Sequence, residues 1–181
     1  LTVVMRILAL NHKAFADMEK GLARLTAPIY KFYHFVRKNT KGGSRKNILA
    51  HYDLGNDFYK LFLDETMTYS CGIFEREDST LREASEAKYD RICRKLKLTT
   101  DDEVLEIGTG WGGFALHAAG KYGVHVTTAT ISDEQHQFAQ NRIKSAGLED
   151  RITLLKKDYR DLSGKFDKLV SIEMIEAVGH H

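Results

Sequence analysis

The sequence predicts an α/β fold in which a doubly wound parallel sheet follows an α-helical amino-terminal region. Three observations lead to this prediction. Short apolar runs alternate with helical segments after residue 101, a glycine-rich turn follows the first of these runs, and helical spacing of apolar residues dominates the stretch before them.

Length and composition limit the architecture. The 181 residues are enough for one domain with a helical extension and too few for two full domains. No apolar run approaches the roughly 20 residues that a transmembrane helix needs, so we expect none. The opening LTVVMRILAL contains Arg6 and lacks a small-residue cleavage site, which favours a buried strand or helix over a signal peptide. Cys71 and Cys93 form neither a disulfide framework nor a metal-ligand pair, which fits a reducing cytosol.

Helical spacing dominates the first part of the chain. Residues 11–38 place apolar side chains at intervals of three and four, with Pro28 as the predicted break. The polar, glycine-containing segment 40–46 is a predicted linker, and residues 47–63 are a predicted helix.

A capping box predicts where the next helix begins. Thr80 and Glu83 have the required spacing and precede an amphipathic stretch over residues 81–98, while the loop TMTYSCGIF lies before them. We therefore predict a basic aromatic helical region with its linker, a second helical segment, and an α/β core, over residues 1–46, 47–98 and 99–181.

Strands and helices alternate in the third segment. The predicted strands are EVLEIG, HVTTAT, ITLLKKD and FDKLVSIEM. Helices over residues 112–122 and 132–146 connect the first three strands. Such crossovers join parallel strands, so the pattern predicts a parallel sheet.

The turn VLEIGTGWGG, residues 104–113, is the clearest candidate for a ligand site. Gly108, Gly110 and Gly112 allow the backbone to turn sharply and to approach a ligand that any β-carbon would exclude. Glu106 lies two residues before the first glycine. A tight turn without a ligand is the alternative, but strand, acid and helix together favour a cofactor site.

Two other classes of cofactor site fit this turn less well. A dinucleotide site expects G-x-G-x-x-G and an acid at the end of the second strand, whereas this turn is G-x-G-x-G. Asp133 and Glu134 come late and resemble acids in the first turn of a helix. A nicotinamide site is therefore a minor alternative, and a P-loop is excluded because no Gly-Lys-Ser/Thr follows.

A longer series of segments carries a specific resemblance. From about residue 46 to residue 180 the chain contains, in order, KNILAHYDLGNDFYKLFLDETMTYSCGIFE, VLEIGTGWGG, TISDEQ, DYRDL and SIEMIEAVGH. These segments resemble the cyclopropane-fatty-acyl-phospholipid synthase family, which includes the mycolic acid cyclopropane synthases. The resemblance implies a Rossmann-like S-adenosylmethionine-dependent methyltransferase sheet, with its first four strands present. It also implies methylene transfer to a cis double bond of a phospholipid acyl chain, forming a cyclopropane fatty acid.

The resemblance further implies the cofactor contacts. Gly108 and Gly110 would line the methionine part of S-adenosylmethionine, and Glu106 would place negative charge near its ammonium and sulfonium groups. The other implied contacts come from the capping segment 47–98, from the end of the second strand and from the end of the third: Tyr69 and Ser70, Ile131 and Gln135, and Asp158 and Tyr159. Without the family pattern, a core position for Tyr69 and an exposed helix position for Gln135 would be preferred.

Cys71 and Glu176 are the implied catalytic residues. Cys71 has no histidine near it in sequence to activate its thiol. In the family the corresponding cysteine contributes mainly its backbone to a bound bicarbonate, and a glutamate at the position of Glu176 holds the same ion. Attack by the alkene would leave a carbocation on the acyl chain, and bicarbonate would act as the base that allows the ring to close. A buried small residue and a solvated helix residue are the alternatives for Cys71 and Glu176.

Charge is distributed unevenly along the chain. Residues 1–50 hold ten Lys and Arg against two Asp and Glu, and residues 51–181 hold 17 against 23. We expect the basic, aromatic end to meet an anionic membrane surface that presents the unsaturated acyl phospholipid, so the protein would be cytoplasmic and peripherally membrane-associated. A solvated basic helix face is the alternative. The sequence shows no nucleic-acid-binding motif and no histidine cluster with metal-ligand spacing, so we expect neither partner.

The family fold has further strands that would follow His181. We therefore expect little methylene transfer by these 181 residues alone, and we expect the edge of the fourth strand to pair, for example in a homodimer. Two other functions stay open: a methyltransferase that acts on another lipid or on a small molecule, and a non-catalytic module that docks on membranes.

Overall fold

The computed structural model describes residues 2–13 and 55–174, and the chain separates into two units, residues 1–40 and 41–181. In the first unit, α1 spans Thr2–Leu10, so a helix does form in the apolar opening segment. The sequence suggests that this element is buried, whereas its described apolar side chains Met5, Ile7 and Leu10 are exposed. Within the described residues, no helix is long and apolar enough to cross a membrane.

Several predictions fall on residues that the structure does not describe. These are the break at Pro28, the linker over 40–46, the first part of the helix over 47–63, and Glu176. The domain boundaries after residues 46 and 98 stay predictions.

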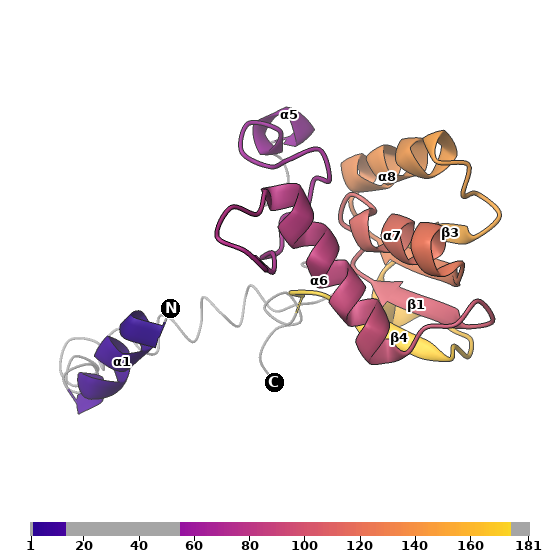
Figure 1. Ribbon diagram of the computed structural model, residues 1–181. Helices are drawn as coiled ribbons and strands as arrows, with labels where there is room; N and C mark the ends of the chain where they lie inside the picture. The colour runs from indigo at the N-terminus through magenta and orange to yellow at the C-terminus, as the bar shows by residue number, and fades with distance from the viewer. Residues whose placement is uncertain (1, 14–54, 175–181) are drawn as a thin grey trace, which may run out of the picture. The chain divides into compact units, whose positions relative to one another are not determined.

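Four parallel strands form the sheet of the second unit (Figure 1). They are β1 (Glu103–Ile107), β2 (His125–Thr130), β3 (Ile152–Lys156) and β4 (Lys168–Ser171), in the order β3-β2-β1-β4. The predicted parallel sheet is confirmed. β4 is shorter than the predicted run FDKLVSIEM, because the chain leaves the strand direction at Glu173, whose φ of 48° lies in the left-handed region.

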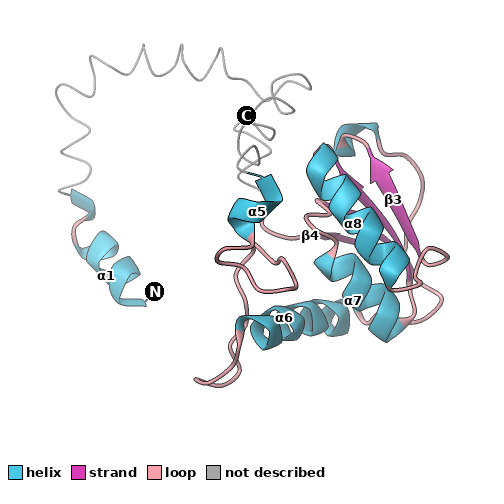
Figure 2. Cartoon of the chain, turned by 90° about the horizontal axis from the view of Figure 1, so that it is seen from above, coloured by secondary structure: helices cyan, strands magenta, loops and turns pink. Residues whose placement is uncertain are grey.

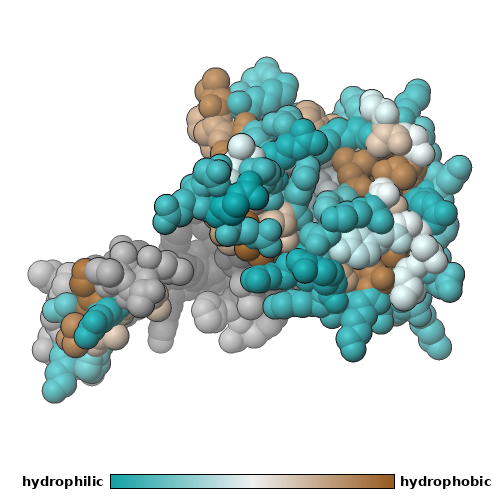
Figure 3. Space-filling model, in the orientation of Figure 1, coloured by the Kyte–Doolittle hydropathy of each residue, from teal (hydrophilic) through white to brown (hydrophobic). Residues whose placement is uncertain are grey.

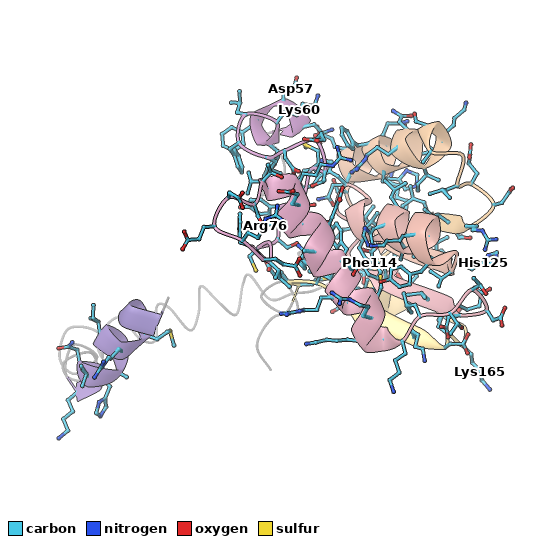
Figure 4. The ribbon with its side chains drawn as sticks, viewed as in Figure 1. Asp57, Lys60, Arg76, Phe114, His125 and Lys165 are labelled. Atoms are coloured by element: carbon cyan, nitrogen blue, oxygen red, sulfur yellow. The ribbon has the colours of Figure 1, made fainter. Side chains whose placement is uncertain are left out.

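Three helices join the strands in one apolar core. They are α6 (Leu81–Leu96), α7 (Gly113–Tyr122) and α8 (Asp133–Ser145), and Figure 2 shows them beside the sheet. The core combines Cys93 of α6 and Phe114 of α7 with Val104, Val126 and Ile152 of the first three strands. Phe114, labelled in Figure 4, is only 1% exposed. Each Å² of apolar surface that is buried contributes about 25 cal/mol, and this burial holds the helices to the sheet.

The predicted capping box is present at the start of α6. The Thr80 hydroxyl accepts from the Glu83 N–H at 3.2 Å, and the Glu83 carboxylate accepts from the Thr80 N–H at 2.8 Å. The helix ends at Leu96, two residues before the prediction, because Lys97 adopts a left-handed conformation and the Leu98 N–H bonds the Cys93 carbonyl at 3.1 Å.

The helix that precedes the TMTYSCGIF loop also ends earlier than predicted. α5 covers Gly55–Tyr59, and the chain turns at once, with the Leu63 N–H bonded to the Tyr59 carbonyl at 2.9 Å. This turn allows Tyr59 and Met67 to pack with Trp111 in a second, smaller apolar cluster. α5 and the loop after it are thereby attached to the glycine turn that contains Trp111.

Helices α7 and α8 each begin one residue later than predicted. Gly112, with a φ of 86°, is the N-cap of α7, and Ser132 is the N-cap of α8, where its hydroxyl accepts from the Gln135 N–H. A β-carbon on Gly112 would lie 3.3 Å from the β-carbon of Ala139, so the two helices approach closely at this point.

Two glycines of α7 predict opposite effects of adding a methyl group. A β-carbon on Gly113 would overlap the ring of Tyr89, which is buried and whose hydroxyl is hydrogen-bonded to Thr68 at 2.7 Å. We expect Gly113→Ala to lower the free energy of unfolding by about 1–3 kcal/mol. At Gly120 the nearest atom to a β-carbon is the Cδ1 of Leu148 at 3.7 Å, so Gly120→Ala should raise it by up to about 1 kcal/mol. Urea titration measures both, and equal effects of the two substitutions would contradict this account.

Candidate functional site

The order of the strands reverses beside β1. The chain moves outward from β1 to β2 and β3, and then returns to the other side of β1 to form β4. In parallel sheets ligands bind outside the carboxyl ends of the strands where the direction of winding reverses. Here that point lies between the carboxyl ends of β1 and β4.

The glycine turn occupies this point. Gly108 and Gly110 have φ values of 94° and 54°, which side chains with a β-carbon rarely adopt. The N–H groups of Gly108 and Thr109 both bond the Ala129 carbonyl at 3.1 Å, and so fix the turn to the end of β2. No atom lies within 4 Å of the position that a β-carbon on Gly110 would take, so this side of the turn is open.

A buried carboxyl group lies directly before the turn. Glu106 is only 2% exposed, and its Oε2 accepts from the Thr128 hydroxyl at 2.6 Å. Thr109 and Thr128 share a further hydroxyl–hydroxyl bond of 2.7 Å. Among the described residues Thr128 is the single donor to this carboxyl group. Burial raises the pKa of Glu106 to about 8, and the bond from Thr128 only partly opposes this effect.

A second polar group lies at the end of β2. The Gln135 side chain is 5% exposed, and its Oε1 accepts from the Thr130 hydroxyl at 3.1 Å. Gln135 is therefore buried, whereas its sequence position taken alone would suggest an exposed residue. Ile131 lies between the end of β2 and the start of α8 and is half-buried.

The TMTYSCGIF loop brings three predicted residues to the carboxyl edge of the sheet. Tyr69 is 50% exposed rather than in the core, and its ring contacts that of Tyr59, with centroids 5.4 Å apart. Ser70 receives hydrogen bonds from the amine of Lys88, a buried residue of α6. The Cys71 N–H donates to the Glu173 carboxylate at 3.0 Å.

The thiol of Cys71 does not have the character of an activated nucleophile. Cys71 is exposed, and the neighbouring Glu173 carboxylate raises the pKa of its thiol. A raised pKa leaves less thiolate at neutral pH. The backbone N–H of Cys71 is therefore the group with a defined interaction at this position.

Several contacts join the residues after β3 to one another. The Asp158 carboxylate is the N-cap of a short 3₁₀ helix, η1 (Tyr159–Asp161), and accepts from the backbone N–H and the guanidinium of Arg160. The same guanidinium lies over the ring of Tyr159, with the Cζ of Arg160 5.5 Å from the ring centroid. Asp158 and Tyr159 thus lie at the predicted strand end, in a local network.

The structure adds residues to the site that the sequence did not indicate. Thr109, Thr128 and Thr130 place hydroxyls around Glu106 and Gln135, and Lys88 and Glu173 hold the loop. The threonine-rich strand HVTTAT was the available signal for the hydroxyls. The described part of the chain contains no group of His, Cys, Asp and Glu that could hold a metal ion.

The site lies at one end of the second unit. Asp57 and Lys60, which form an ion pair at 2.9 Å on and beside α5, mark this end in Figure 4. His125, the first residue of β2, and Lys165, which precedes β4, mark the other. The glycine turn, Glu106 and the loop therefore lie at the carboxyl edge of the sheet.

Known proteins share this sequence and fold. The family model for mycolic acid cyclopropane synthetase matches residues 39–181. A probable fatty acid methyltransferase of Pseudomonas putida is 45% identical over 146 residues, which cover 80% of this chain and 37% of that protein. The cyclopropane-fatty-acyl-phospholipid synthase of Escherichia coli K12 is 47% identical over 129 residues, 71% of this chain and 32% of that protein.

A solved structure agrees with these matches. A crystal structure of a mycolic acid cyclopropane synthase in complex with SAH and CTAB superimposes with a TM-score of 0.72 and 39% sequence identity, covering 75% of this chain and 48% of that one. The chain thus spans about a third to a half of the length of the relatives it matches. The family model matches most of the chain, residues 39–181, and so shows that the chain belongs to the mycolic acid cyclopropane synthetase family.

Proposed function

We propose that the protein transfers a methylene group from S-adenosylmethionine to a cis double bond of a phospholipid acyl chain, forming a cyclopropane fatty acid. The observation that carries this proposal is the buried Glu106 carboxyl group beneath an open glycine turn, in a chain of the cyclopropane synthase family. A carboxylate held away from water favours a cationic ligand, and S-adenosylmethionine carries an ammonium and a sulfonium group.

The residues of the site fit this cofactor. The open side of Gly110 gives a ligand access to the backbone, and one oxygen of Glu106 accepts from no described residue. The Gln135 amide accepts from Thr130 through Oε1, which leaves its N–H groups to donate to ribose hydroxyls. Tyr69 and Ser70 would contact the ligand from the loop, with Ile131, Asp158 and Tyr159 on the adenosine side.

The proposed reaction depends more on the alignment of the reactants than on a strong acid. When bound, S-adenosylmethionine supplies an electrophilic methyl group. The protein must align the alkene with it and keep water out, because attack leaves a carbocation on the acyl chain that water would capture. The half-exposed ring of Tyr69 provides apolar surface beside the turn, and the buried cluster of Tyr59 and Trp111 supports it.

A bicarbonate ion is our proposal for the base that completes ring closure. It would be held by the Cys71 N–H and by Glu176. In this structure the Cys71 N–H is bonded to Glu173, so an anion at Cys71 would take the place of that carboxylate.

Lipid surfaces are the proposed partner. Phe58, Leu61 and Phe62, on and after α5, are 41%, 81% and 48% exposed, and Figure 3 shows hydrophobic side chains over α5. The excess of basic residues in positions 1–50 supports attraction to anionic headgroups. We therefore propose a cytoplasmic protein that associates peripherally with membranes and binds an unsaturated acyl phospholipid.

A second candidate is methyl transfer without ring closure. It is favoured by the name of the Pseudomonas putida relative, a probable fatty acid methyltransferase. The two reactions share the cofactor site and differ in the fate of the carbocation.

Binding of S-adenosylmethionine should depend on pH through Glu106. The raised pKa, about 8, means that the free protein carries a proton on this group at neutral pH, while a bound cation requires the carboxylate. Affinity should therefore rise between about pH 6 and pH 7.5, by up to about tenfold per unit, with release of a proton. Calorimetry in buffers of different ionisation enthalpy measures both quantities. Glu106→Gln should bind at least about a hundredfold more weakly and release no proton.

Two controls separate binding from folding. Glu103→Gln changes an exposed glutamate of the same strand and should leave affinity unchanged. In the unfolded chain Glu106 loses its proton near the ordinary pKa of a glutamate, 4.5, so the free energy of unfolding should fall as pH rises from about 5 to about 8, and Glu106→Gln should remove that fall. Equal affinity of Glu106→Gln and the parent protein would refute the role of this carboxyl group.

The lipid product tests the reaction. A chain extended to the length of its relatives, expressed in a bacterium that makes unsaturated but no cyclopropane fatty acids, should add the mass of one CH₂ to membrane acyl chains. Mass spectrometry detects the addition, and proton NMR separates ring protons from those of a methyl branch. Glu106→Gln should abolish the product and Glu103→Gln should retain it. A methyl-branched product would support the second candidate, and unmodified lipids would overturn both.

A further inference from the structure

One hydrogen bond joins the end of β4 to the loop that carries the proposed cofactor contacts. The Glu173 carboxylate accepts from the Cys71 N–H at 3.0 Å. The two residues are distant in sequence, and neither lies in a helix or strand. Among the residues that the structure describes, Glu173 interacts with Cys71 through this contact and with Lys88 through its charge.

A buried ammonium group lies close to the same point. Lys88 is 5% exposed on α6, and its amine donates to the carbonyl and hydroxyl of Ser70. Burial lowers the pKa of this amine, and the negative charge of Glu173 acts in the opposite direction. Ser70 and Cys71 are thus held by two opposite charges, one from α6 and one from the end of β4.

The backbone of Glu173 supports a specific role for its side chain. Its φ of 48° lies in the left-handed region, which glycine adopts far more readily. The next residue, Met174, places its sulfur 3.2 Å from the position of a β-carbon on Gly108. The turn that directs Glu173 to the loop therefore also borders the glycine turn.

The far end of the loop is attached independently. The Ile73 N–H bonds the Ala84 carbonyl at 2.9 Å, and a β-carbon on Gly72 would overlap that of Ala84. Residues 72–73 are therefore fixed on α6, and Tyr69 packs on Tyr59, whereas Ser70 and Cys71 depend on the polar contacts with Lys88 and Glu173.

We propose that Glu173 is a positioning residue: with Lys88 it holds the Tyr69–Cys71 segment over the carboxyl ends of β1 and β4. The ligand that this segment covers rests on the proposed function, S-adenosylmethionine. Glu173→Gln keeps a hydrogen-bond acceptor for the Cys71 N–H and removes the charge that opposes Lys88, and Glu173→Ala removes both. Glu173→Gly also removes the carboxylate and relieves the backbone, so it should fold at least as well as the parent chain.

The thiol of Cys71 reports this contact without any ligand. Cys71 is exposed and Cys93 is fully buried, so iodoacetamide should modify the folded 181-residue chain at Cys71. Because Glu173 raises the pKa of the Cys71 thiol, Glu173→Gln and Glu173→Gly should be alkylated about three- to tenfold faster at pH 8. Glu77→Gln removes the same charge from an exposed residue between this loop and α6 and should change nothing. Superimposable pH–rate profiles for Glu173→Gln and the parent chain would overturn the proposal.

Binding of S-adenosylmethionine supplies the second measurement. Glu173→Ala and Glu173→Gly should bind about tenfold more weakly, Glu173→Gln about two- to threefold more weakly, and Glu77→Gln as tightly as the parent chain. Affinity unchanged in Glu173→Gly would overturn the positioning role. A parent chain that does not bind S-adenosylmethionine, but shows the expected alkylation rates, would refute the proposed function and leave the contact between Glu173 and the loop supported.

Discussion

The burial of the Glu106 carboxyl group is the constraint on which the rest of the site depends. A carboxylate removed from water is costly unless it receives hydrogen bonds or meets a positive charge. Here Thr128 donates one hydrogen bond to the carboxyl group, and Thr109 bonds Thr128 in turn. This bond does not offset the loss of water, so burial raises the pKa of Glu106. The free protein therefore keeps an unmet requirement at the carboxyl end of β1, and a cation bound above the glycine turn would meet it.

Much of the fold could be predicted from the sequence, because it rests on local patterns. Four apolar runs became four parallel strands, and Thr80 and Glu83 formed the capping box at the predicted place. Helix ends were harder to predict. The left-handed residue at Lys97 and the turn after Tyr59 reflect long-range packing, on the core and on Trp111, which spacing along the chain does not encode.

The candidate site was predictable in part, for a similar reason. Glu106, Gly108 and Gly110 lie together in one motif, and Gln135 follows the next strand, so topology alone brings them to one edge. The contact of Glu173 with Cys71 joins positions far apart in the chain through one side-chain oxygen and one backbone nitrogen, and no periodicity of the sequence indicates it. Lys88 was hidden because its helix is otherwise amphipathic and rich in exposed charges.

The close approach of Gly112 to Ala139 has a consequence for how such proteins diverge. The start of α7 lies so close to α8, one turn after Gln135, that the space between them would not hold one additional methyl group without a shift. A larger side chain at either position would push α8 outward and carry Gln135 away from the end of β2. Gly112 has no side chain to lose, so Ala139 cannot become larger without displacing α8. A side chain at Gly112 would require a loss of volume at Ala139 and would also be strained by the φ of 86°.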